Sequence, residues 1–114
     1  MHLYGLKNCD TCRAALKALR AAGQEVDFTD LRADTVSSEN LVRFQAAFGA
    51  ALINRRSSTW RGLSDSQRAA DPLDLLAAHP ALMKRPVIEA GGQLYLGWGA
   101  DVRAALLGNG AQSA

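Results

Sequence analysis

The chain contains two cysteines, Cys9 and Cys12, which stand at the start of a helical pattern with two residues between them. A thiol at a helix N-terminus lies beside unpaired backbone N–H groups and the positive end of the helix dipole. Both features favour the thiolate, which is the reactive form of cysteine. A second thiol one helical turn further on can capture a mixed disulfide formed by the first. The pair therefore indicates dithiol redox chemistry, with Cys9 as the nucleophile and Cys12 as a resolving thiol.

Two other interpretations of the cysteines stay open at this point. Cys12 lies on the apolar face of the expected helix, so it could be a core residue with no chemical role. A zinc site would need both cysteines together with His2, His79 or an outside ligand. The chain lacks a second closely spaced pair of ligands of the kind that structural zinc sites use. We therefore expect no metal site and no bound cofactor.

The charges near Cys9 have opposing effects on its acidity. Asp10 is its direct neighbour, and a carboxylate beside a thiol raises the thiol pKa. Lys7 and Arg85 would offset this effect if both side chains point at the sulfur. We expect Lys7 to act as an electrostatic helper of the nucleophile.

Length and composition set broad limits on function. The chain has 114 residues, 48% of them hydrophobic, and no apolar stretch of membrane-spanning length. Nothing at its start resembles a signal peptide, and two cysteines without an export signal favour a reducing compartment, so we expect a cytoplasmic protein. The net charge of +2 is too small to indicate nucleic acid. We expect no direct nucleic-acid partner and no membrane, and a small anionic or disulfide substrate.

The first thirty residues predict a strand, a helix and a second strand. The segment His2–Leu6 is short and apolar enough for a buried strand. Asn8 is the expected N-cap of a helix that runs to about Ala22 and stops at Gly23. Val26–Asp30 predicts the second strand, and the helical crossover makes the two strands parallel.

The middle of the chain predicts a group of helices. Ser37 or Ser38 is the expected cap of the first. Ser64 and Gln67 have the spacing of a capping box for another. Asp71, followed by proline, predicts the start of a third.

The last third of the chain returns to strands. Val87–Ala90 and Gln93–Leu96 flank the dipeptide Gly91–Gly92, which predicts an antiparallel hairpin with a two-residue turn. A final short helix then passes through Val102 and ends at Gly108.

This element order predicts an α/β protein with a thioredoxin/glutaredoxin-like fold. Its sheet would be mixed and four-stranded, with a helical insertion between strands 2 and 3. A CxxC motif beside a βαβ unit favours the same fold. We expect a single thioredoxin-like domain over residues 1–114, with a redox core from 1–33 and 81–108, a helical insert from 34–80 and a flexible tail from 109–114.

Three segments carry a resemblance to a known family. They are Tyr4-Gly5-Leu6-Lys7-Asn8-Cys9-Asp10-Thr11-Cys12, Leu52-Ile53-Asn54-Arg55-Arg56-Ser57-Ser58-Thr59-Trp60 and Leu82-Met83-Lys84-Arg85-Pro86-Val87-Ile88. In order and spacing they resemble the arsenate-reductase-like (ArsC/Spx) family of thioredoxin-fold proteins, and most closely its YffB-type branch. The resemblance spans nearly the whole chain.

The resemblance implies roles for individual residues. Cys9 would be the catalytic cysteine, Arg85 an arginine near its thiol, and Pro86 a proline that is cis in this fold. Arg56 would be a further basic residue that contacts the substrate. We also expect Lys7, Asn8 and Pro86 to contribute to substrate binding.

The implied activity is that of a glutathione-dependent thiol reductase. Cys9 would attack a glutathione mixed disulfide, and Cys12 or a second glutathione would resolve the intermediate. Glutathione or a thioredoxin-type protein would supply the electrons, with glutathione as co-substrate.

Departures from the family pattern keep two alternatives open. A true arsenate reductase would carry another arginine after the last strand, where this chain has Leu96-Gly97-Trp98, and an arginine where it has Asn54. The CxxC pair is shared with the Spx regulators. An Spx-like redox-sensing regulator would bind the alpha subunit of RNA polymerase.

Overall fold

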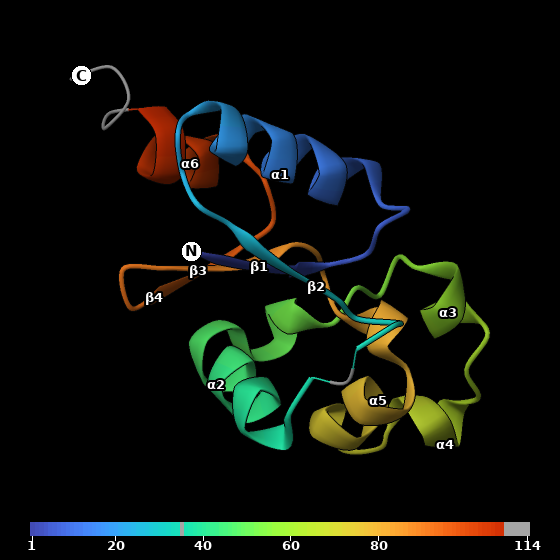
Figure 1. The fold of residues 1–114 in the computed structure, drawn as a ribbon. Coiled ribbons are helices and arrows are strands. Elements are labelled where there is room, and N and C mark those ends of the chain that lie inside the picture. The colour runs from blue at the N-terminus through green and yellow to red at the C-terminus, as the bar shows by residue number, and fades with distance from the viewer. Residues whose placement is uncertain (35, 109–114) are drawn as a thin grey trace. The chain divides into compact units, whose positions relative to one another are not determined.

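The computed structural model describes residues 1–34 and 36–108 (Figure 1). The chain divides into two compact units, one formed by Met1–Asp30 and Arg85–Ala114 and the other by Leu31–Lys84. These boundaries lie a few residues away from those expected between redox core and insert. That the two units form one domain stays a prediction. The expected flexible tail, 109–114, lies outside the described residues.

The first unit contains a mixed four-stranded sheet. Its strands are β1 (His2–Gly5), β2 (Asp27–Asp30), β3 (Val87–Ala90) and β4 (Gln93–Leu96), in the order β2-β1-β3-β4. β1 runs parallel to β2 and antiparallel to β3, and β3 and β4 form an antiparallel hairpin. The expected parallel pair, the expected hairpin and the mixed four-stranded sheet are confirmed, and the structure adds the antiparallel pairing of β1 with β3. The turn residues Gly91 and Gly92 both have positive φ, which glycine adopts without strain.

Two helices lie on the same side of this sheet (Figure 1). They are α1 (Asp10–Ala21) and α6 (Ala100–Arg103), which continues as a π-helical turn, η3 (Ala104–Gly108). The core between helices and sheet consists of Leu3, Cys12, Ala15, Leu19, Val26 and Ile88, with Val102, Leu106 and Leu107 packed against it. This architecture is the predicted thioredoxin-like fold.

The expected start of α1 is wrong by one residue. Cys9, not Asn8, occupies the N-cap position, and its side chain makes no capping hydrogen bond. The Cys9 carbonyl accepts the first helical bond from the Arg13 N–H at 3.0 Å, while its own N–H donates to the Leu6 carbonyl at 3.1 Å. This turn before the helix moves the cap to Cys9, so the sulfur is attached to the cap residue itself.

The second unit is built from short helices. They are α2 (Ser38–Phe48), η1 (Gly49–Leu52), α3 (Ser58–Arg61), α4 (Asp65–Arg68), α5 (Pro72–Ala78) and η2 (Pro80–Leu82). The predicted caps are confirmed, because the Ser37 and Asp71 side chains accept backbone N–H bonds and Ser64 with Gln67 forms a full capping box. Among the described residues, no helix has the length and apolar character that a membrane span requires.

Two segments of the second unit pair side by side. Ile53 and Met83 form an isolated antiparallel bridge. The Asn54 N–H donates to the Leu82 carbonyl at 2.8 Å, and the Lys84 N–H donates to the Leu52 carbonyl at 2.7 Å. This pairing brings residues that follow η1 next to residues that follow η2.

Candidate active site around Cys9

Cys9 lies where the loop after β1 becomes α1, and its side chain is only partly buried. Partial burial raises the pKa of this thiol, but three groups act against it. The backbone N–H and the thiol of Cys12 donate hydrogen bonds to the Cys9 sulfur, and the Arg85 guanidinium adds a hydrogen bond and a positive charge. The net result is a lowered pKa for Cys9. A reachable, more acidic thiol is the arrangement that nucleophilic cysteines use.

Cys12 lies one helical turn further on and has the opposite properties. It is 1% exposed and belongs to the core between α1 and the sheet. Burial and the negative charge of the Cys9 thiolate raise the pKa of the Cys12 thiol to about 12. Cys12 therefore stays protonated at neutral pH and acts as a hydrogen-bond donor to Cys9.

Arg85 and Pro86 immediately precede β3. Arg85 is half-buried, Pro86 is fully buried, and the peptide bond between them is cis, as the family resemblance implied. The Pro86 carbonyl accepts a hydrogen bond from the Gly97 N–H at 2.8 Å, which holds the end of β4 beside this segment. Arg85 is the basic residue that the structure brings to the Cys9 sulfur.

Lys7 and Asn8 are exposed in the loop before Cys9. The backbone N–H of Lys7 donates to the Asp30 carboxylate at 3.4 Å. Lys7 is not among the groups that lower the pKa of Cys9, so Arg85 supplies the electrostatic help that was expected from both. Contact of Lys7 and Asn8 with a substrate stays a prediction.

Asp10, which was expected to raise the pKa of Cys9, points into solvent. Its carboxylate is fully exposed and lies 3.9 Å from the Arg13 guanidinium. An exposed charge of this kind is strongly screened by water and salt. It therefore has little influence on the Cys9 sulfur.

Two residues of the site escaped sequence reasoning. Gly5 ends β1 against Cys12, because a Cβ atom at Gly5 would collide with the Cys12 sulfur. Asp30 ends β2 directly opposite Gly5 and is the buried acid of the sheet, 8% exposed. A glycine that ends a buried strand before a CxxC loop was the available signal for close packing. Only the parallel register identifies Asp30, since its carboxylate accepts the N–H of Lys7, which is 23 residues away in the sequence.

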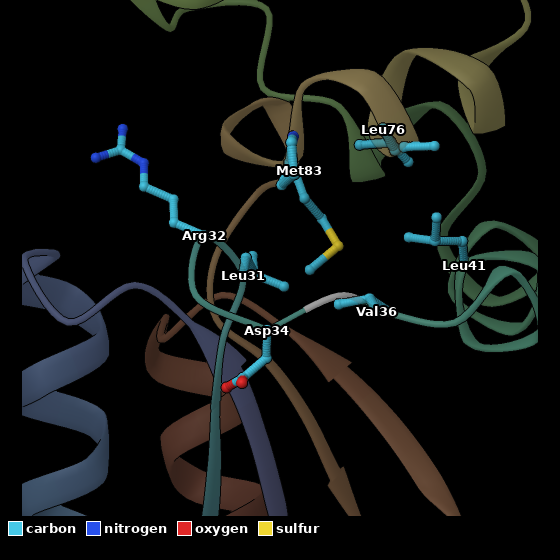
Figure 2. A pocket seen from close by; sticks show the side chains of 9 residues that line it. Leu31, Arg32, Asp34, Val36, Leu41, Leu76 and Met83 are labelled. Carbon is cyan, nitrogen blue, oxygen red and sulfur yellow. The ribbon is translucent and has the colours of Figure 1, made fainter.

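Arg56 belongs to the second unit, Leu31–Lys84, and its contact with a substrate stays a prediction. It lines an open hollow with Arg55 and Lys84, and its side chain is exposed. A separate cavity of about 180 Å³ in the same unit is lined mainly by apolar side chains, among them Leu31, Leu41 and Met83 (Figure 2). No cluster of three or more potential ligand side chains suited to a metal occurs within residues 1–34 and 36–108.

The fold and the Cys9 geometry together define a thiol-dependent, reductase-like protein with a thioredoxin-like fold. The chain belongs to the ArsC family, which it matches over residues 4–105. It is 37% identical over 101 residues to an uncharacterized protein of Haemophilus influenzae, covering 84% of this chain and 89% of that protein.

Solved structures similar to this chain agree with the YffB-type assignment. The YFFB protein has a TM-score of 0.85 and 36% identity, covering 93% of this chain and 97% of its own. An arsenate reductase (ArsC) related protein from Brucella melitensis has a TM-score of 0.70 and 33% identity, covering 91% of both chains. The chain is therefore a YffB-type member of the family.

Proposed function

We propose that this protein is a cytoplasmic thiol-disulfide oxidoreductase that depends on glutathione and uses Cys9 as its nucleophile. The observation that carries the proposal is the opposite acidity of its two thiols. Cys9 is reachable and has a lowered pKa beside Arg85, whereas Cys12 is buried and has a raised pKa. One thiol is thereby selected for attack.

The first step of the proposed reaction is a thiol–disulfide exchange. The Cys9 thiolate attacks the glutathione sulfur of a mixed disulfide, and a Cys9–glutathione bond forms. The other sulfur leaves with the electron pair of the broken S–S bond and takes a proton from solvent. Arg85 stabilises the attacking thiolate and remains beside the sulfur when the thiolate is regenerated.

The second step removes glutathione from Cys9. The thiolate of a second glutathione attacks the glutathione sulfur of the intermediate, and oxidised glutathione forms while Cys9 leaves as a thiolate. Cys12 is the slower candidate for this step, because its pKa of about 12 leaves almost no thiolate at neutral pH. When the Cys12 thiolate attacks the Cys9 sulfur, the Cys9–glutathione bond breaks, a Cys9–Cys12 disulfide forms and glutathione leaves as a thiolate that takes a proton from solvent. Glutathione or a thioredoxin-type protein then reduces the disulfide. Neither route uses a bound cofactor.

Arsenate is the less favoured substrate, because the position after β4 lacks an arginine. The Gly97 N–H bonds to the Pro86 carbonyl, so this position lies beside the Arg85 segment and holds a residue without a side chain. One guanidinium, that of Arg85, then lies beside Cys9 instead of two. Arsenate-dependent turnover that Cys9→Ser abolishes would favour the arsenate reductase instead.

Mass spectrometry of the protein after incubation with oxidised glutathione tests the proposal. The wild type should gain one glutathione on Cys9, and Cys12→Ser should gain it as well. Cys9→Ser should lose at least about 10³-fold of the exchange rate, because it lacks the nucleophile. Equal, slow modification of both thiols in the wild type would contradict the proposal.

The regulator alternative makes a different prediction. It requires binding to the alpha subunit of RNA polymerase that changes when the Cys9–Cys12 pair is oxidised. A pull-down with oxidised and reduced protein distinguishes the two functions, since glutathione exchange without polymerase binding supports the enzyme.

A further inference from the structure

Three cations gather around one open hollow in the Leu31–Lys84 unit. Arg55, Arg56 and Lys84 line it together with Asn54, and its volume is about 440 Å³. No carboxylate is among its lining residues. This volume falls in the range of small-molecule sites in proteins. The backbone bonds that pair Asn54 with Leu82 and Lys84 with Leu52 hold the two halves of the hollow together.

The three cationic side chains differ in how they are held. Arg55 is fixed, because its Nη1 donates to the Ala50 carbonyl at 3.0 Å and its guanidinium lies 5.3 Å from the Trp60 ring centre. The side chains of Arg56 and Lys84 are exposed, and in the described part of the chain they have no hydrogen bond or ion pair. Two unengaged cations beside a fixed one repel each other until an anion neutralises them.

Asn54 adds a neutral donor to the same hollow. Its Oδ1 accepts the Arg56 backbone N–H at 3.0 Å, so the side-chain amide keeps its NH2 group as a donor. A guanidinium, an ammonium and an amide NH2 are all donors that match a carboxylate or phosphate oxygen. The hollow thus presents donors and positive charge to an oxyanion.

The apolar cavity of the same unit is a useful contrast. Arg32 and Asp34 line that cavity too, but their charged ends point away from Leu31, Leu76 and Met83 (Figure 2). The charged groups of Arg32 and Asp34 are therefore not directed at the apolar side chains that line this cavity. The two hollows differ in the feature that would hold an anion.

We infer that the hollow formed by Asn54, Arg55, Arg56 and Lys84 binds a carboxylate of glutathione. The inference rests on the proposed glutathione-dependent function, because that co-substrate carries two carboxylates. Arg56 and Lys84 contact the carboxylate, while Arg55 supplies a fixed positive charge behind them.

Titration calorimetry with S-methylglutathione tests the inference. This thioether cannot form a disulfide, so its binding does not depend on Cys9 chemistry. The double variant Arg56→Gln/Lys84→Gln should bind S-methylglutathione about tenfold more weakly. The expected loss is only about tenfold because exposed ion pairs contribute less to binding than buried ones. Added salt should weaken wild-type binding in the same direction. Lys17→Gln, which removes an exposed charge from α1, should bind as the wild type does.

Two further probes separate the possible sources of the oxyanion. S-Methylglutathione with both carboxylates esterified should bind the wild type as weakly as the free acid binds the double variant. Equal affinity of wild type and double variant for S-methylglutathione would overturn the inference. The inference would also be overturned if inorganic phosphate bound the wild type but not the double variant, while S-methylglutathione bound neither protein. The site would then be one for free phosphate.

The failure of this inference and of the proposed function are distinguishable. Glutathionylation of Cys9 by oxidised glutathione is read by mass spectrometry, independently of the calorimetry. Normal glutathionylation with S-methylglutathione affinity unchanged in the double variant rejects the carboxylate site alone. An unreactive Cys9 in a protein whose S-methylglutathione binding depends on Arg56 and Lys84 rejects the proposed reaction and supports the site.

Discussion

Helix α1 places one cysteine thiol at its N-terminus and another on its buried face, and the two thiols have different surroundings. At the N-terminus, the Cys9 sulfur accepts hydrogen bonds from the backbone N–H and the thiol of Cys12 and from the Arg85 guanidinium. On the buried face, the Cys12 sulfur lies in the hydrophobic core against Gly5. The pKa is lowered at the first position and raised at the second, although only two residues lie between them. Position on the helix thus gives the two thiols of this CxxC motif opposite acidities.

The largest effect that we expect from the raised pKa of Cys12 is a loss in the free energy of unfolding at high pH. Below pH 9 the Cys12 thiol is protonated in both folded and unfolded chains. Above pH 9 the unfolded chain loses this proton first, while the folded chain keeps it up to a pKa of about 12. Stability should therefore fall between pH 9 and 12 by about 1.4 kcal/mol per pH unit from this group.

Urea unfolding at pH 8, 10 and 11 measures that slope. Cys12→Ala should show a smaller loss of stability over the interval, and Thr11→Ala, a change at an exposed neighbour, should keep the wild-type slope. Cys9 contributes the opposite sign: its stabilisation is present above its unfolded pKa and is lost as pH falls through the folded one. Identical slopes for wild type and Cys12→Ala would mean that the Cys12 thiol is not held protonated.

Gly5→Ala should break the packing behind Cys12. The added Cβ would collide with the Cys12 sulfur and lie 3.1 Å from its Cβ, and the Cys12 side chain is buried. We expect a loss of about 1–3 kcal/mol in the free energy of unfolding. Gly62→Ala is the matched control, because Gly62 has a negative φ and the nearest atom to its added Cβ is 3.5 Å away.

The double variant Gly5→Ala/Cys12→Ala sharpens this result. Removing the Cys12 sulfur relieves the collision, so the double variant should be less destabilised than the sum of the two single changes. Simple additivity would show that Gly5 does not act through Cys12.

Arg85→Met should slow the reaction of Cys9 with iodoacetamide at pH 7 by roughly fivefold, because the thiolate loses its nearest positive charge. The difference should vanish above the pKa of both proteins, where Cys9 is ionised with or without the arginine. A rate–pH profile of both proteins measures this. Arg103→Met, which removes an exposed arginine from α6, is the control, and an equal decrease there would assign the effect to net charge.

Local patterns predicted most of the scaffold because local forces decide it. The Gly91–Gly92 turn and the Ser37, Ser64 and Asp71 caps depend on residues a few positions apart. The start of α1 was missed because the bond from Cys9 to Leu6 shifts the cap by one residue.

The candidate site was predictable only in part. The cysteines were visible in the sequence, but the effect of Arg85 on Cys9 crosses more than seventy positions and came from family resemblance. Asp30 takes its place beside the Cys9 loop from strand register, which no window of sequence contains, whereas Gly5 had a local signal before the CxxC motif. Long-range pairing therefore limited the prediction of the site more than that of its elements.

The smallest expected effect is that of Asp10→Asn. A carboxylate beside the nucleophile would ordinarily make the thiol less acidic, so its removal should speed alkylation if the charge reached the sulfur. Here the carboxylate is fully exposed and lies near Arg13, and water screens it. The iodoacetamide rate of Cys9 at pH 7 should change by less than about twofold. A larger acceleration would show that Asp10, and not only burial, opposes Arg85 at the edge of α1.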